Sequence, residues 1–79
     1  MKEKMIELVK AKINEVLREN SLSSVQLEGD TNILKDTPID SMGLAIVVTK
    51  MEEATGIDPF EKGFILFQTI NELASLYEK

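Results

Sequence analysis

The chain has 79 residues, contains neither cysteine nor histidine, and carries a formal net charge of −5. This length allows one domain, 1–79, with a thin interior, and the missing residue types exclude a disulfide framework, a thiolate metal site and the commonest general base. The acidic charge disfavours binding to nucleic acid. The sequence has no apolar run long enough to span a membrane and no targeting segment, so we expect a cytoplasmic protein. We also expect it to be a monomer.

The start of the chain predicts an amphipathic helix from about residue 2 to residue 20. Its apolar residues recur at three- and four-residue steps: Ile6, Val9, Ile13, Val16 and Leu17. Asn20 and Ser21 are expected to end this helix.

Residues 21–40 show no sustained period and are punctuated by Ser, Gly, Asp, Asn and Pro. We expect a long loop in which Thr31-Asn32 caps a short turn at residues 33–36. Its apolar residues are predicted to pack against the helices: Leu22, Val25, Leu27, Ile33, Leu34 and Ile39.

A second helix should begin at Asp40 or Ser41, since either residue is a good N-cap, and end at Thr55-Gly56. Its inward stripe is Leu44, Val47, Val48 and Met51. Asp58-Pro59 then opens a short third segment that runs to about Lys62 or Phe64.

The last helix is expected at about Thr69 to Glu78, with Ile70, Leu73, Ala74 and Tyr77 inward. The fold class is therefore all-α: a small bundle of three main helices plus one short helix. The predicted core includes Ile6, Val9, Ile13, Val47, Met51, Ile70 and Leu73. Phe60, Phe64 and Phe67 are also expected in the core, with the lining of a pocket as the alternative.

A serine stands where the long loop is expected to become the second helix, in the segment Asp36-Thr37-Pro38-Ile39-Asp40-Ser41-Met42-Gly43-Leu44. There its hydroxyl can face solvent, and the helix N-terminus offers unpaired N–H groups and partial positive charge. A phosphodiester on Ser41 would lie in that favourable field, and Asp40 could help a modifying enzyme to hold Mg²⁺. A serine near a helix start is also an ordinary N-cap, so composition alone leaves both interpretations open.

The triplet Asp40-Ser41-Met42 resembles the attachment motif of the acyl carrier protein family, the phosphopantetheine-binding carrier proteins. In that family the triplet is usually Asp-Ser-Leu, and another Asp stands four residues before the first, as Asp36 does here. The resemblance covers the whole chain, through Met51-Glu52-Glu53, Gly56-Ile57-Asp58-Pro59 and Thr69-Ile70.

The resemblance implies a carrier that does no catalysis itself and holds no metal. A phosphopantetheinyl transferase would place 4′-phosphopantetheine on Ser41, with Asp40 as the second cofactor-binding residue, and the thiol of the arm would carry an acyl group as a thioester. Partners would be loading and processing enzymes of a lipid or secondary-metabolite pathway. An aliphatic bundle could shelter the acyl chain between its second and third helices.

Some residues depart from the pattern of the fatty-acid members of the family. Gly43 and Ile46 stand where acids are usual, Lys50 adds a positive charge, and Thr37-Pro38 replaces Leu-Gly. These departures favour a specialised acyl carrier over a general role in fatty acid biosynthesis. A stand-alone aminoacyl or peptidyl carrier and a helical interaction domain without a prosthetic group are the alternatives.

One face of the second helix is predicted to dock partner enzymes. It lies opposite the inward stripe and carries Met42, Ala45, Ile46, Thr49, Glu52 and Glu53. The half near Ser41 is apolar and the far half is acidic.

Overall fold

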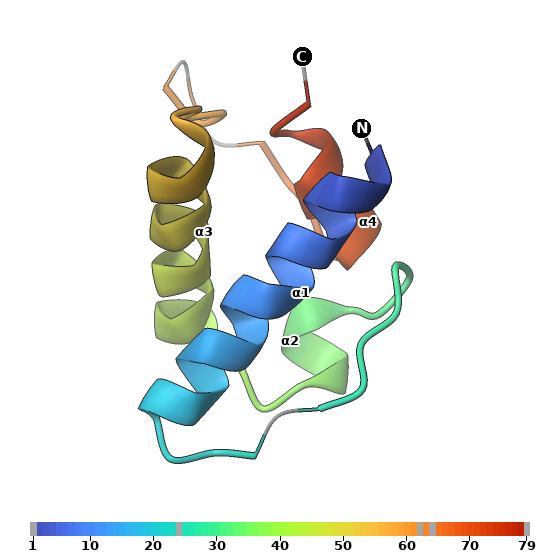
Figure 1. The fold of residues 1–79 in the computed structure, drawn as a ribbon, viewed down its shortest axis with the longest axis vertical. Helices are drawn as coiled ribbons and strands as arrows, with labels where there is room; N and C mark the ends of the chain where they lie inside the picture. Colours follow the sequence, from blue (N-terminus) through green and yellow to red (C-terminus); the bar gives the residue numbers. More distant parts are fainter. Residues whose placement is uncertain (1, 24, 62, 64, 79) are drawn as a thin grey trace.

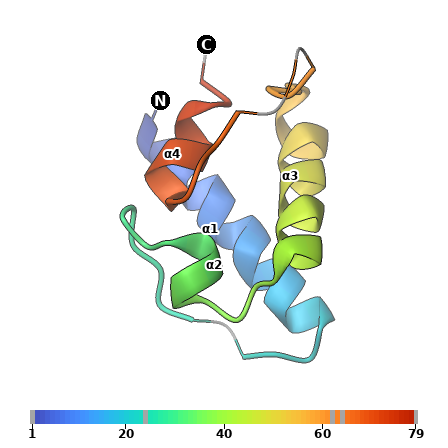
Figure 2. The same ribbon diagram turned by 180° about the vertical axis from the view of Figure 1, so that it is seen from behind.

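The computed structural model describes residues 2–23, 25–61, 63 and 65–78. These residues form four helices: α1 (Lys2–Glu19), α2 (Ile33–Asp36), α3 (Ser41–Thr55) and α4 (Ile70–Ser75). Figure 1 shows α1 running diagonally across the molecule, with α3 on one side and α4 on the other. In the reverse view of Figure 2, α2 lies below α4. The predicted small all-α fold is confirmed.

The end of α1 is fixed by a hydrogen-bonded turn at the residues predicted to end it. Ser21 adopts a left-handed conformation with φ of 62°. The Ser21 amide donates to the Arg18 carbonyl at 3.0 Å, and the Leu22 amide donates to the Leu17 carbonyl at 2.7 Å. This pair of bonds is a Schellman motif, which satisfies carbonyl groups at the helix end and turns the chain away from the helix axis.

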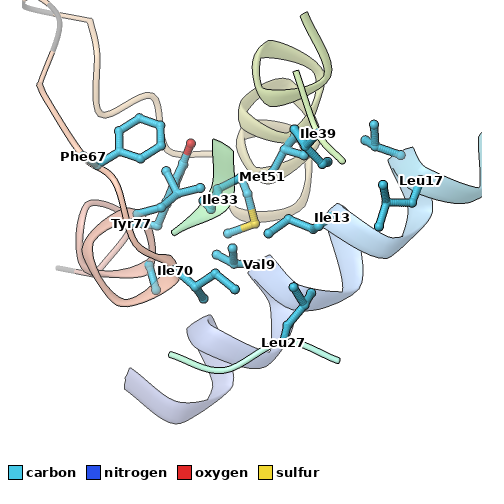
Figure 3. Packing of buried hydrophobic residues seen from close by; sticks show 14 residues of the cluster. Val9, Ile13, Leu17, Leu27, Ile33, Ile39, Met51, Phe67, Ile70 and Tyr77 are labelled. Atoms are coloured by element: carbon cyan, nitrogen blue, oxygen red, sulfur yellow. The ribbon is translucent and has the colours of Figure 1, made fainter. Parts of the chain in front are cut away.

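The core forms where α1 packs against both α3 and α4. Figure 3 shows its buried side chains meeting between these helices. They are Val9, Ile13, Val16, Leu17, Leu27, Ile33, Ile39, Val47, Met51, Phe67, Ile70, Leu73, Ala74 and Tyr77. Two described residues of the predicted core, Ile6 and Phe60, are only partly buried and pack against the edge of the cluster. Phe64 lies outside the described residues.

The loop between α1 and α3 is anchored by α2 and by the start of α4. The Asn32 side chain caps α2 by accepting a hydrogen bond from the Lys35 amide at 3.0 Å, which confirms the predicted short turn. The Ile33 amide donates to the Gln68 carbonyl, beside an isolated bridge between Asn32 and Thr69. The loop is thus held to the segment that precedes α4.

Two apolar loop residues do not pack inward as predicted. Leu22 is 41% exposed and Leu34 is 49% exposed, whereas Leu27, Ile33 and Ile39 are buried. The reason is geometric: Leu22 follows the tight turn that ends α1, and Leu34 lies on a helix of four residues. In so short a helix one side chain, that of Ile33, reaches the core.

The chain between α3 and α4 also differs from the prediction. The expected short helix after Asp58 is a turn over residues 59–61, and Lys62 and Phe64 lie outside the described residues. Its backbone hydrogen bonds join residues three apart. The Glu61 amide donates to the Asp58 carbonyl, and the Gly63 amide donates to the Phe60 carbonyl. Gly63 has φ of 136°, a conformation that no helix continues through.

The last helix is shorter than predicted, because it ends at Ser75 instead of near Glu78. Beyond Ser75, the backbone amides of residues 76–78 each donate a hydrogen bond to the carbonyl three residues earlier, as in a turn. The predicted inward residues of this segment are nonetheless all buried: Ile70, Leu73, Ala74 and Tyr77. No described helix is both long and apolar enough to cross a membrane.

Candidate functional site

Ser41 is the first residue of α3, and the residue before it caps the helix. The Asp40 side chain accepts a hydrogen bond from the Gly43 amide at 2.7 Å, and the Asp40 carbonyl accepts one from the Leu44 amide at 2.9 Å. Asp40 is therefore the N-cap, and Ser41 is not. The Ser41 side chain is exposed at a helix terminus that favours negative charge.

An apolar groove opens beside Ser41 between α3, α2 and the segment before α4. Its volume is about 550 Å³. Among the described residues of its wall, Ser41 is the one with a polar side chain; these residues are Leu34, Ser41, Leu44, Ala45, Val48, Phe60, Leu66 and Phe67. The Phe60 and Phe67 rings lie 6.0 Å apart and are tilted by 35°.

The groove explains why Leu44 and Val48 are only partly buried, although both were predicted to point inward. Val47 and Met51 face the core and are fully buried. The inward stripe of α3 is therefore divided: one side fills the core, and the other forms a wall of the groove.

A second, smaller hollow lies between the end of α1 and the start of α3, and we name it the notch. Its volume is about 190 Å³. Its lining is Val16, Leu17, Asn20, Leu22, Pro38, Ile39, Asp40, Met42, Gly43 and Ile46. Its lining includes both chain neighbours of Ser41, Asp40 and Met42, whereas Ser41 itself lines the groove.

Five of the six exposed large apolar side chains in the described part of the chain line one of these hollows. Leu22, Met42 and Ile46 line the notch; Leu34 and Leu66 line the groove. The sixth, Ile65, is next to Leu66 in the chain. Scattered apolar surface residues are normal, but here they gather around one serine.

The six residues of the predicted docking face are all exposed: Met42, Ala45, Ile46, Thr49, Glu52 and Glu53. They do not share one hollow, because Met42 and Ile46 line the notch whereas Ala45 lines the groove. Met42 is the most prominent of the apolar ones, with 73% of its side chain exposed.

Gly43 has a packing role that the sequence analysis missed. A Cβ atom on this glycine would lie 3.3 Å from both Asp40 Oδ1 and Ile39 Cγ2, and 3.6 Å from Val16 Cγ1. The missing side chain thus lets the first turn of α3 approach α1 and the cap. A glycine inside a helical pattern was the available signal, since such a residue usually has a packing reason.

Two other charged residues near the site have local structural roles. The Asp36 carboxylate accepts a hydrogen bond from the Asn32 amide at 2.9 Å, within α2. Lys50 donates to Glu19 at 3.0 Å and lies 3.6 Å from Glu15, so it joins α3 to α1. The hydrogen bond to Glu19 raises the pKa of Lys50. Lys50 is therefore paired with carboxylates of α1 instead of offering an isolated positive charge.

No cluster of acidic residues in the described part of the chain could hold a metal ion. Comparison with known proteins adds no assignment, because the chain matches no protein-family model, no curated protein and no solved structure. The features of the chain that bear on function are Ser41 and the two hollows beside it.

Proposed function

We propose that this protein is a specialised acyl carrier protein, with Ser41 as the attachment site of 4′-phosphopantetheine. The observation that carries the proposal is an exposed serine that is not the helix cap and that opens onto a large apolar groove. An ordinary capping serine would hold the N-terminal amides itself, but here Asp40 does so.

The residues around Ser41 fit such a group. Its phosphodiester would meet the partial positive charge at the start of α3. When bound, the group supplies a thiol that holds the carried acyl chain as a thioester, which this cysteine-free chain cannot supply itself. In attachment, the Ser41 hydroxyl oxygen forms a bond to the pantetheine-side phosphorus of coenzyme A. The bond from that phosphorus to the adenylate part breaks, adenosine 3′,5′-bisphosphate leaves, and a base of the transferase takes the serine proton.

The chemistry of the groove favours an acyl cargo over an aminoacyl one. Apart from Ser41, the described residues that line it are aliphatic or aromatic. Each methylene group buried there contributes roughly 0.8 kcal/mol, whereas a buried ammonium group without a partner is strongly disfavoured. The stand-alone aminoacyl or peptidyl carrier is thus the weaker alternative, and the carrier itself performs no catalysis.

The notch is suited to partner enzymes. Leu22, Met42 and Ile46 offer an exposed apolar surface beside the attachment site, and Glu52 and Glu53 lie further along α3. A partner that places an apolar side chain in the notch and a basic one near the glutamates would reach Ser41 without covering the groove. These partners are the transferase and the loading and processing enzymes of a lipid or secondary-metabolite pathway.

The test is the intact mass of the protein after incubation with coenzyme A, Mg²⁺ and a broad-specificity phosphopantetheinyl transferase. We expect one phosphopantetheine per chain, located on Ser41 by fragmentation. Ser41→Ala should abolish the addition and leave the helical circular dichroism unchanged. Ser23→Ala, an exposed serine in the loop, is the matched control and should be modified like the wild type.

An unmodified wild-type chain would support the interaction domain without a prosthetic group instead. Addition that persists in Ser41→Ala would place the modification on another serine and contradict the proposal.

A further inference from the structure

The Tyr77 hydroxyl has no hydrogen-bond partner among the described residues, although only 1% of this residue is exposed. A buried hydroxyl without a partner destabilises a folded protein relative to a phenylalanine of the same shape. The ring of Tyr77 packs in the core, whereas its oxygen forms no hydrogen bond with the described residues. The position of this oxygen points to a ligand.

Tyr77 is not among the described residues that line the groove, so a link between its hydroxyl and the groove runs through neighbouring side chains. Two carboxylates near the phenol add to the effect of burial in raising the pKa of Tyr77. Glu52 lies in the last turn of α3, and Asp58 lies just beyond the end of that helix. The turn after Asp58 carries Phe60, whose amide donates to Asp58 at 3.0 Å. Figure 3 shows the Tyr77 oxygen directed toward the side of the core where Phe67 lies.

Phe67 therefore connects the two features. Its ring lines the groove with that of Phe60, and it belongs to the same buried cluster as Tyr77. A chain that enters beside Ser41 and runs along Leu44 and Val48 arrives at Phe67. A rotation of this ring would extend the groove toward the Tyr77 hydroxyl.

We propose that the carried acyl chain bears an oxygen substituent remote from its thioester, and that Tyr77 donates a hydrogen bond to that oxygen once Phe67 moves aside. This inference rests on the proposed carrier function and narrows its cargo to an oxygenated acyl group. A site with a buried donor discriminates strongly against a ligand that leaves the donor unpaired, so a plain alkyl chain would bind less well at this end.

The experiment compares the wild type with Tyr77→Phe, each loaded on Ser41 with octanoyl and decanoyl chains, with and without a keto oxygen on the penultimate carbon. Two readouts are used: the midpoint of thermal unfolding and the infrared stretching frequency of the ¹³C-labelled keto group. Two chain lengths are needed because the oxygen must reach the Tyr77 hydroxyl.

For at least one length, we expect the keto group to raise the midpoint by about 4 °C more in the wild type than in Tyr77→Phe. The keto stretch should have a lower frequency in the wild type, as a hydrogen-bonded carbonyl does. Equal keto effects in both proteins at both lengths would overturn the inference alone. Failure of the wild type to load would overturn the proposed function and this inference with it.

Discussion

At the scale of single residues, Tyr77 gives the protein a specific sensitivity to alkali. Burial raises the pKa of Tyr77 from 10.0 to about 12, and the nearby carboxylates of Asp58 and Glu52 add to the effect. Between these values the unfolded chain loses its phenol proton while the folded chain keeps it. The free energy of unfolding should therefore fall by about 1.4 kcal/mol per pH unit across this window.

The measurement is urea unfolding at several pH values from 9 upward, compared with Tyr77→Phe. The variant should lack this component of the slope, and the difference between the two proteins should appear only above pH 10. Because Tyr77 is the sole tyrosine, its ionisation can be followed directly by phenolate absorbance. Ionisation in the native protein near pH 10 would contradict its burial.

At the scale of elements, the capping box of α4 makes this short helix sensitive to acid. The Glu72 side chain accepts hydrogen bonds from the Thr69 and Gln68 amides, each at 2.9 Å, and these bonds lower its pKa below 4.5. The Thr69 hydroxyl in turn accepts from the Glu72 amide at 3.1 Å. This reciprocal pair defines the start of a helix of only six residues.

The stabilisation from ionised Glu72 should be complete above about pH 4.5, its unfolded-state value, and be lost as the pH falls through the lower folded-state pKa. Glu72→Gln should flatten this part of the pH profile of the thermal midpoint. Glu78→Gln, with a glutamate beyond the helix, is the matched control. An identical acid profile for Glu72→Gln and the wild type would argue against the capping box.

The two sides of the inward stripe of α3 should respond differently to truncation. Val47 and Leu73 are fully buried, so Val47→Ala and Leu73→Ala should each lower the free energy of unfolding by roughly 1–4 kcal/mol. Val48 lines the groove and leaves no closed cavity when shortened, so Val48→Ala should cost less than Val47→Ala. Denaturant titration measures all three; equal costs for Val47 and Val48 would contradict the division between core and groove.

At the scale of the whole molecule, the proposed carrier function assigns cargo to the groove and partner enzymes to the notch, two separate hollows beside Ser41. Ile46 lines the notch and does not line the groove. Ile46→Glu should therefore weaken docking of the cognate partner, because it places a charge in an apolar contact, while it leaves the effect of a carried acyl chain on stability unchanged. It should also improve recognition by general fatty-acid enzymes, which dock through basic patches.

Turnover of the modified protein by both sets of enzymes tests this prediction. Gln26→Glu adds the same charge at an exposed loop position outside both hollows and should leave turnover unaltered. Salt should depress association only mildly, since the contact is largely apolar. Unchanged turnover of Ile46→Glu with the cognate partner would remove the notch from the docking mechanism.

The two long helices, the capped turn at 33–36 and the position of Ser41 at the start of α3 could all be predicted from the amino-acid sequence alone. These features depend on local rules: apolar spacing along α1, caps such as Asn32 and Asp40, and the left-handed stop at Gly56. Such rules act between residues a few positions apart, so they can be read along the chain.

The use of each helix face, in contrast, depends on tertiary packing and could not be predicted from the sequence. The tertiary structure divides the stripe of α3 between core and groove and places Leu22 beside Met42 in the notch. It buries the Tyr77 hydroxyl with no hydrogen-bond partner among the described residues. It also replaces the expected helix after Asp58 with a turn. The physical reason is that the groove, the notch and the burial of side chains all arise from packing between segments distant in sequence. Hydrophobic periodicity identifies the apolar face of a helix, but it does not show which segment covers that face.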